Sequence, residues 1–232
     1  MTGFPRYAIY FVADAASTLS RFGAELLGYA AHTGREVPFP GEALRTAPDW
    51  RDVSADPRKY GFHATLKAPM ALAPGRTEAE LATACATFAG RARPIPLIHP
   101  VVDSISGFIA VIPAEPVGEL QQLAADCTRD FDEFRAALST EDRARRKPEK
   151  LGERQRDYLD RWGYPYVMEE FRFHMTLTGR LDAERRGPIL EMLRARFAAL
   201  DLNTLAIDRI ALFKQDDAKA RCRIIGEWAL TR

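Results

Sequence analysis

The sequence Phe-His-Ala-Thr-Leu-Lys at residues 62–67 returns almost unchanged as Phe-His-Met-Thr-Leu-Thr at residues 173–178. Apolar and polar residues alternate in both stretches, which is typical of a β-strand because successive side chains of a strand point to opposite faces. His and Thr therefore share one face of each strand, and the apolar residues share the other. The repeat predicts two matching strands, each of which presents an imidazole beside a hydroxyl.

The order of elements around this motif is repeated as well. Each half is expected to form a motif strand, at residues 60–68 and 171–179, followed by one helix and then by further strands. Connections between the later strands are too short for helical crossovers, which predicts antiparallel pairing. The repeat indicates internal duplication and an α+β fold, with residues 1–232 forming a single bilobed domain. One helix is expected to begin at Thr77, where Thr77 and Glu80 form a capping box, and the other to cover 182–200. The later strands are expected at 95–99, 108–112, 204–207, 209–214 and 223–231.

The remaining segments are predicted from their local patterns. A strand at 6–12 precedes a helix at 14–27 that Gly28 ends, and a further helix covers 116–134. Residues 29–57 are rich in Pro, Gly and Asp and are expected to form a long irregular connection. Residues 139–162 carry eight basic and six acidic side chains. This mixture is more typical of a solvated link between the lobes than of a substrate-binding arm.

Charge and composition limit the classes of protein to which this chain can belong. The formal net charge of +1 provides no global basic field for a long nucleic acid, so a small anionic substrate is favoured. No apolar stretch approaches the roughly 18 residues of a membrane span, and the first residues lack a signal-peptide pattern. We expect a cytoplasmic protein without a membrane partner. The three isolated cysteines are expected to be reduced core thiols; the oligomeric state stays open.

The polar faces of the two strands suggest acid–base chemistry. The pKa of free histidine, about 6.5, allows one imidazole to be neutral and another protonated near neutral pH, as a general base and a general acid require. His63 and His174 are therefore the candidate catalytic pair, and the order of their roles stays open. Hydroxyl and cationic side chains on the same faces can bind phosphate oxygens. These candidate substrate-binding residues are Thr65, Thr176, Lys67, Arg172 and Thr178.

Other catalytic constellations have less support. The two motifs carry no carboxylate or cysteine at ligand spacing, so neither a metal nor another cofactor is expected. No Gly-x-Ser-x-Gly elbow and no glycine-rich phosphate loop is present. His32 and His99 lie outside any repeated frame and are interpreted as incidental.

The paired sequences His63-Ala64-Thr65 and His174-Met175-Thr176 resemble the signature of the 2H (two-histidine) phosphoesterase superfamily, which includes the bacterial RNA 2',3'-cyclic phosphodiesterases once called 2'-5' RNA ligases. The wider stretches 6–11, 59–69 and 171–179 are similar to the branch encoded near phosphonate-utilisation genes. That genomic association implies a small phosphorylated sugar or nucleotide as the substrate, and RNA is not favoured. This resemblance implies two pseudo-symmetric lobes with helices outside, a central cleft, and metal-independent cleavage of a cyclic phosphodiester. It implies that the histidines are acid and base and that Thr65 and Thr176 bind phosphate.

A second class of function stays open on the sequence alone. Lys67, Arg172 and the basic stretch 143–147 would also suit a noncatalytic phosphate-ligand or RNA-binding module. The enzyme is favoured because binding alone does not need two titrating groups.

Overall fold

A seven-stranded sheet forms the centre of the computed structural model, which describes residues 3–232. Its strand order is β11-β10-β1-β4-β8-β7-β6, and every neighbouring pair is antiparallel. The predicted α+β class with antiparallel strands is confirmed. The strands are β1 (Arg6–Phe11), β4 (Ala64–Met70), β6 (Pro100–Ile105), β7 (Phe108–Pro113), β8 (Met175–Thr176), β10 (Arg209–Gln215) and β11 (Arg223–Ala229).

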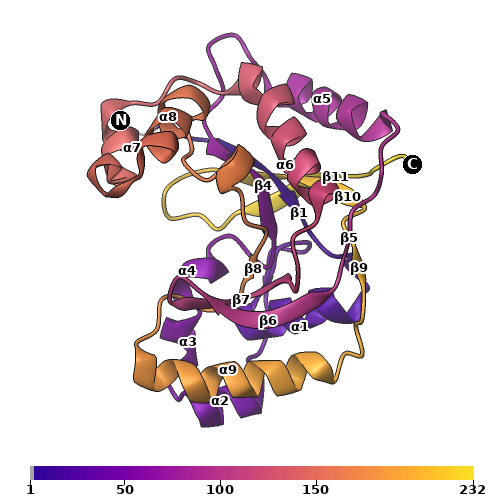
Figure 1. Cartoon of the computed structure of the whole chain (residues 1–232), viewed down its shortest axis with the longest axis vertical. Coiled ribbons are helices and arrows are strands. Elements are labelled where there is room, and N and C mark those ends of the chain that lie inside the picture. Colours follow the sequence, from indigo (N-terminus) through magenta and orange to yellow (C-terminus); the bar gives the residue numbers. More distant parts are fainter. Residues whose placement is uncertain (1–2) are drawn as a thin grey trace.

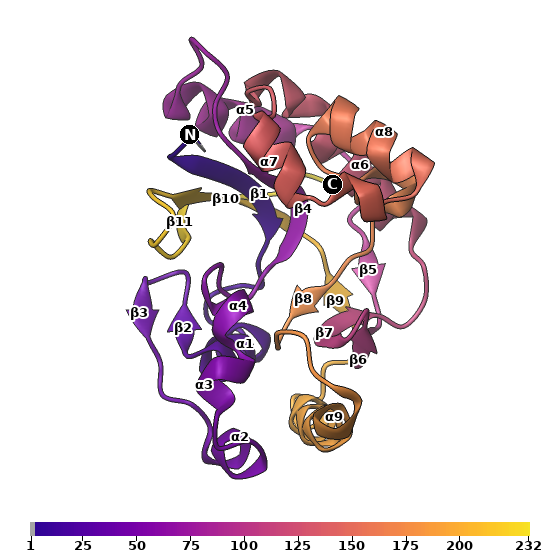
Figure 2. The ribbon, with the colours of Figure 1, turned by 90° about the vertical axis from the view of Figure 1, so that its left-hand side faces the viewer.

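The two motif strands, β4 and β8, are neighbours at the middle of this sheet. They pair at one position, where Ala64 lies opposite Met175. This junction joins a four-stranded half, β11-β10-β1-β4, to a three-stranded half, β8-β7-β6. The two halves diverge from this junction in Figures 1 and 2. The duplicated motifs therefore meet where β4 pairs with β8.

Helices cover both halves and enclose an extended apolar core. In the first half, α5 (Glu78–Gly90) packs on β10 and β11, and α6 (Gly118–Asp130) packs on β4. In the second half, α9 (Ala183–Ala198) packs on β6, and α1 (Thr18–Leu27) meets α9 through Phe22 and Phe197, whose ring centroids are 5.6 Å apart. The buried core includes residues of both halves.

Local sequence signals set the ends of these helices. Thr77 and Glu80 form the predicted capping box at the start of α5, and the Asp182 side chain accepts a hydrogen bond from the Arg185 backbone at the start of α9. Gly28 ends α1 with φ of 64°, a left-handed conformation that glycine adopts without steric cost. No helix within residues 3–232 has the length and apolar character that crossing a bilayer requires.

The segment 29–57 is the largest departure from prediction, because it is ordered rather than irregular. The Trp50 side chain is fully buried, and its Nε1 donates to the Leu26 carbonyl at 2.7 Å. Arg58 Nε donates to the Leu27 carbonyl at 2.6 Å. These long-range contacts fix short elements that local composition cannot signal: β2 (Tyr29–Ala30), β3 (Arg35–Glu36), α2 (Gly41–Thr46), α3 (Trp50–Val53) and α4 (Ala55–Arg58).

The motif strands also differ in length from the predictions. β4 continues through Pro69 to Met70, where the β1–β4 register shifts and β8 no longer pairs, so the missing N–H of Pro69 costs little. β8 contains only Met175 and Thr176, and the chain then turns so that the Gly179 amide donates to the Val53 carbonyl.

Segments beyond the motifs show further differences. Strand β6 was not predicted, and the link 139–162 forms two helices and a 3-10 turn beside the gap between the halves (Figure 2). The three cysteines are buried and free, which confirms the thiol prediction. The other elements are β5 (Leu97–Ile98), β9 (Leu205–Ala206), α7 (Thr140–Arg145), α8 (Glu153–Trp162) and 3-10 turns at Asp132–Phe134, Pro148–Lys150 and Met168–Glu170.

Candidate active site

The pairing of β4 with β8 brings the four motif side chains together. Ala64 and Met175 lie opposite each other and are fully buried on the core side. One residue further along each strand, the antiparallel register places His63 opposite Thr176 and Thr65 opposite His174, and these side chains share the other face. Opposed Cβ atoms lie about 5 Å apart, and the diagonal pair of histidines roughly 7–8 Å apart. The motifs thus form one constellation of two imidazoles and two hydroxyls.

The two imidazoles are held by the same backbone hydrogen bond. His63 Nδ1 lies 2.8 Å from the Gly61 carbonyl, and His174 Nδ1 lies 2.7 Å from the Arg172 carbonyl. A carbonyl oxygen only accepts, so Nδ1 carries the proton in each neutral ring and Nε2 keeps the free lone pair. His63 Nε2 lies 3.5 Å from Thr65 Oγ1. Each ring therefore offers Nε2 for proton transfer.

The environment favours neutral rings. Burial lowers the pKa of His63 to about 4, against the opposing effect of the Gly61 hydrogen bond, and positive charge on His174 lowers it further. Burial also lowers the pKa of His174, and its bond to the Arg172 carbonyl opposes this shift. At neutral pH, His63 is therefore equipped to accept a proton.

Aromatic rings support both imidazoles. Tyr10, on β1, stacks on His63 with ring centroids 3.8 Å apart, and Phe108, on β7, lies 5.5 Å from His174. Sequence analysis missed both residues. The strand containing Tyr10 was predicted, but only the β1–β4 register, in which Tyr10 lies opposite Thr65, reveals the stack.

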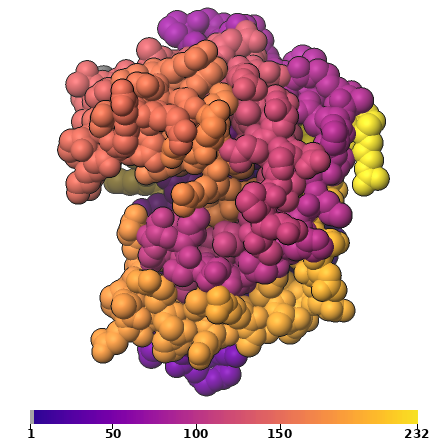
Figure 3. Space-filling model, viewed as in Figure 1, coloured from indigo at the N-terminus to yellow at the C-terminus, as the bar shows by residue number. Residues whose placement is uncertain are grey.

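A cavity of about 450 Å³ lies beside this constellation: Thr65 and His174 are part of its wall, whereas His63 and Thr176 are not. The wall combines residues of the 139–170 region with residues near β7 and Arg180. Figure 3 shows the surface hollowed between these two parts. The predicted Arg172 also lines the cavity and is exposed. The wall further includes Ser106, Phe108, Gln155, Tyr164, Tyr166, Glu170 and Phe171.

Lys67 corrects one prediction for the site. Its side chain is 3% exposed, and Nζ donates to the Thr128 carbonyl at 2.9 Å and to Asp132 Oδ1 at 2.7 Å. Burial lowers the pKa of Lys67, and the pairing with Asp132 opposes this effect. The ammonium group is therefore committed to holding α6 and the following turn against β4, because leaving its partners would strand a buried charge.

Thr178 corrects a second prediction. The regular alternation stops after Thr176, and the Thr178 side chain is fully buried. Its hydroxyl accepts from the Ile109 amide at 3.0 Å and donates to the Gly179 carbonyl at 2.8 Å. Thr178 therefore fixes the end of the motif strand to β7 instead of facing the cavity.

The other residues considered from the sequence lie in different places. Tyr60 is near the site, with its ring centroid 6.0 Å from that of His63, and Tyr166 lines the cavity. Lys214 pairs with Glu78 at 2.7 Å. His99 Nδ1 lies 3.0 Å from the Asn203 carbonyl.

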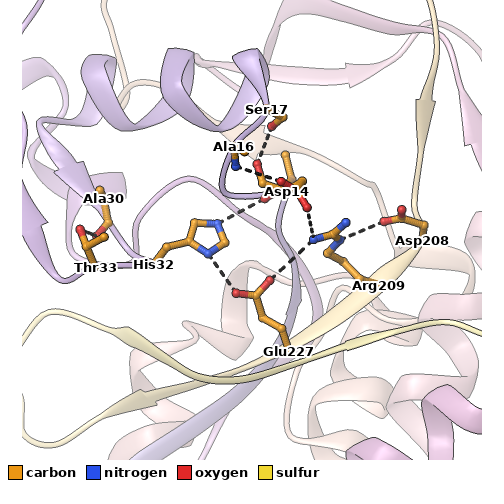
Figure 4. Close-up of polar contacts among 10 residues, drawn as sticks. Asp14, Ala16, Ser17, Ala30, His32, Thr33, Asp208, Arg209 and Glu227 are labelled. Atoms are coloured by element: carbon orange, nitrogen blue, oxygen red, sulfur yellow. Dashed lines mark hydrogen bonds and ion pairs between the residues drawn. The ribbon is translucent and has the colours of Figure 1, made fainter.

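His32 belongs to a separate polar cluster, shown in Figure 4. Its ring bridges Glu227 Oε1, at 2.9 Å, and the Ala13 carbonyl, at 3.2 Å. Arg209 contacts Asp14 and Asp208 in the same cluster. These contacts tie β10 and β11 to the segment after β1. His32 thus makes a structural contact, as expected for a histidine outside the candidate catalytic pair. Across residues 3–232, no three His, Cys, Asp or Glu side chains are grouped as a metal site would require.

Comparison with known proteins gives one family match. Residues 65–223 match the family described as "Protein of unknown function (DUF1045)". Two curated proteins, both named ribose 1,5-bisphosphate phosphokinase PhnN, are similar over most of this chain. The protein from Janthinobacterium sp. (strain Marseille) is 35% identical over 91% of this chain and 48% of its own length. The protein from Laribacter hongkongensis (strain HLHK9) is 33% identical over 97% of this chain and 52% of its own. The chain therefore spans about half the length of the curated relatives it matches.

Solved structures also match along nearly the whole chain. A structure of E. coli LigT complexed with NADP+ is 19% identical, with a TM-score of 0.44, over 98% of both chains. A structure described as a phosphoesterase is 18% identical, with a TM-score of 0.43, over 99% of this chain and all of its own.

Proposed function

This chain belongs to the family described as "Protein of unknown function (DUF1045)", and we propose that it hydrolyses a cyclic phosphodiester in a small phosphorylated sugar or nucleotide without a metal ion. The observation that carries the proposal is the constellation at the β4–β8 junction, in which two His-x-Thr motifs share one face of the sheet. Two similarly held imidazoles with free Nε2 atoms match the needs of paired general acid–base catalysis.

The proposed chemical step divides two proton transfers between the histidines. Neutral His63 accepts a proton at Nε2 from water while the water oxygen forms a bond to phosphorus. The bond from phosphorus to the sugar oxygen breaks, and His174, in its protonated form, donates its Nε2 proton to that oxygen. The product is a phosphomonoester, and proton exchange with solvent resets both rings. The low pKa of His63 supports its assignment as the base.

The remaining polar groups are proposed to bind the phosphate. Thr65 and Thr176 lie opposite the two histidines, where their hydroxyls can donate to non-bridging oxygens. Arg172, on the cavity wall, adds positive charge near the negative charge of the phosphoryl group in the transition state. A bound anionic phosphodiester also favours the protonated form of His174, because an opposite charge nearby raises the pKa of an imidazole.

The substrate class rests on association as well as on the site. The curated relatives are named for a kinase of ribose 1,5-bisphosphate, which is a phosphorylated pentose. The branch of the 2H superfamily that this sequence resembles is encoded near phosphonate-utilisation genes. Together these associations support a phosphorylated sugar intermediate of phosphonate breakdown as the substrate, with RNA disfavoured.

The test is a substrate panel with product identification. Nucleoside 2',3'-cyclic phosphates, ribose cyclic phosphates and 2'-5'-linked dinucleotides are incubated with the purified protein in the presence of a chelator. Turnover of a cyclic phosphate, lost in His63→Ala and in His174→Ala, is the expected result. Turnover that chelation abolishes and added metal restores would contradict the mechanism. Binding without turnover of any compound would instead identify a noncatalytic phosphate-binding module.

A further inference from the structure

A second hollow of about 220 Å³ adjoins the cavity that His174 lines. The two spaces share Ala68, Tyr164 and Val167 in their walls. Tyr60 also lines the second hollow, and its ring centroid lies 6.0 Å from that of His63. We call it the Arg146 hollow, with a wall that includes Arg6, Tyr60, Arg135, Arg145, Arg146 and Tyr164.

Positive charge dominates this wall. Four arginines line the hollow, and Lys67 borders it with its ammonium bonded to Asp132 and the Thr128 carbonyl. Within residues 3–232, the carboxylates that pair with members of this set are Asp132 and Asp142. Asp142 pairs with both Arg6, at 2.6 Å, and Arg145, at 3.5 Å. The excess of cations over carboxylates makes the hollow a suitable place for an anion.

Arg146 differs from the other cations in its contacts. Among residues 3–232, no carboxylate lies within ion-pair distance of its guanidinium group, which lies over the Tyr164 ring with Cζ 4.9 Å from the centroid. A guanidinium group stacked on an aromatic ring is held in place while its N–H donors stay available. Burial raises the pKa of Tyr164 and that of Tyr10, and the positive charge of Arg146 opposes both shifts, so its field reaches the tyrosine that stacks on His63.

We propose that the Arg146 hollow binds a second phosphate group, a phosphomonoester carried by the same substrate whose cyclic phosphodiester lies at the histidines. This inference rests on the proposed function and narrows it to doubly phosphorylated substrates. Arg146 is the main ligand because its bidentate N–H fork matches phosphate oxygens and no carboxylate competes for it. Arg6 and Arg145 share one carboxylate and add to the local field.

The kinetic test compares adenosine 2',3'-cyclic phosphate with the same compound carrying a 5'-phosphate. We expect the wild-type protein to favour the 5'-phosphorylated compound in kcat/KM by about tenfold or more, because one charge-assisted contact is worth that much. Arg146→Met should remove this preference by slowing only the phosphorylated compound. Arg143→Met is the matched control, since Arg143 lies in α7, which ends just before Arg146, but pairs with Asp160 at 2.7 Å outside the hollow. A preference that survives Arg146→Met would overturn the proposal.

A binding measurement separates this inference from the proposed function. Calorimetry compares adenosine 3',5'-bisphosphate with adenosine 3'-monophosphate, which requires no turnover. We expect tighter binding of the bisphosphate, with the difference lost in Arg146→Met and kept in Arg143→Met. If neither cyclic compound is hydrolysed but the bisphosphate binds in this Arg146-dependent way, the proposed hydrolysis fails and the second phosphate site stands. Equal affinity of the wild-type protein for the two compounds would contradict the second site.

Discussion

Tyr10 stacks on the imidazole of His63, with ring centroids 3.8 Å apart and ring planes inclined by 22°. Phe213 lies against the same pair, 4.8 Å from Tyr10 and 5.9 Å from His63. The stack excludes water from one face of the imidazole, and the Gly61 carbonyl fixes Nδ1. His63 is therefore restrained in both orientation and tautomer, which is the condition for efficient proton transfer from a fixed atom.

The stack predicts a positioning role for Tyr10. Tyr10→Leu should lower kcat by about tenfold with little change in KM, because the ring of His63 loses its planar support. Tyr10→Phe retains the ring and should restore kcat, which separates ring support from any role of the hydroxyl. Steady-state kinetics on the folded variants, with thermal unfolding as the check on folding, measures both. Equal loss of kcat in the two variants would argue against support by stacking.

The pKa shifts of the histidines predict the pH dependence of kcat/KM. Activity requires neutral His63, so it should fall as the pH drops through about 4. Activity also requires protonated His174, whose pKa lies below 6.5, so it should fall again as the pH rises past that lowered value. The profile of the free enzyme should be bell-shaped, with its maximum on the acidic side of neutrality. Rates measured in buffers of constant ionic strength test this, and an optimum above pH 8 would exclude the assigned roles.

Burial of His63 also predicts a pH dependence of stability. Its pKa is about 4 in the folded protein and about 6.5 when unfolded, so the unfolded state binds the extra proton between these values. Above about pH 6.5 the titration of His63 does not change the free energy of unfolding. As the pH falls toward 4, the same titration lowers the free energy of unfolding by up to about 3 kcal/mol. His63→Gln removes the titration, so the variant should gain stability relative to wild type across this window. Denaturant unfolding at several pH values provides the comparison, and parallel curves would show that His63 is not desolvated.

The sequence was most informative where function imposes a local pattern. The alternation of His and Thr identified the two motif strands, and Thr77 with Glu80 marked a helix start that the structure contains. The alternation could not show that β4 and β8 are direct neighbours, because their pairing joins residues far apart in the chain. It also could not show where the second strand ends, because the Ile109 amide and the Val53 carbonyl, both far away in the sequence, determine that turn.

Two further features of the site depend on tertiary contacts. The alternating pattern predicts that Lys67 faces the cavity, but its ammonium is buried and bonded to Asp132 and the Thr128 carbonyl. The local sequence pattern contains no sign of these long-range contacts. The mixed charges of 139–162 are typical of a solvated link, and several of them form ion pairs, such as the exposed pair of Arg143 with Asp160. Arg146, in the same segment, instead lines a hollow next to the cavity. Composition cannot distinguish such an arginine from the solvated charges around it.

The contrast between Lys67 and Arg172 gives the final prediction. Lys67→Met should leave KM unchanged in the folded fraction but lower the free energy of unfolding by about 2 kcal/mol, because the partly buried Asp132 and the Thr128 carbonyl lose their charged donor. Arg172→Met should do the reverse, raising KM or lowering kcat/KM about tenfold with little effect on stability, since Arg172 is exposed on the cavity wall. The measurements are the kinetic constants and the free energy of unfolding of each of the two variants. An unchanged stability together with a raised KM in Lys67→Met would return Lys67 to the substrate site, and would mean that its ammonium leaves Asp132 when the substrate binds.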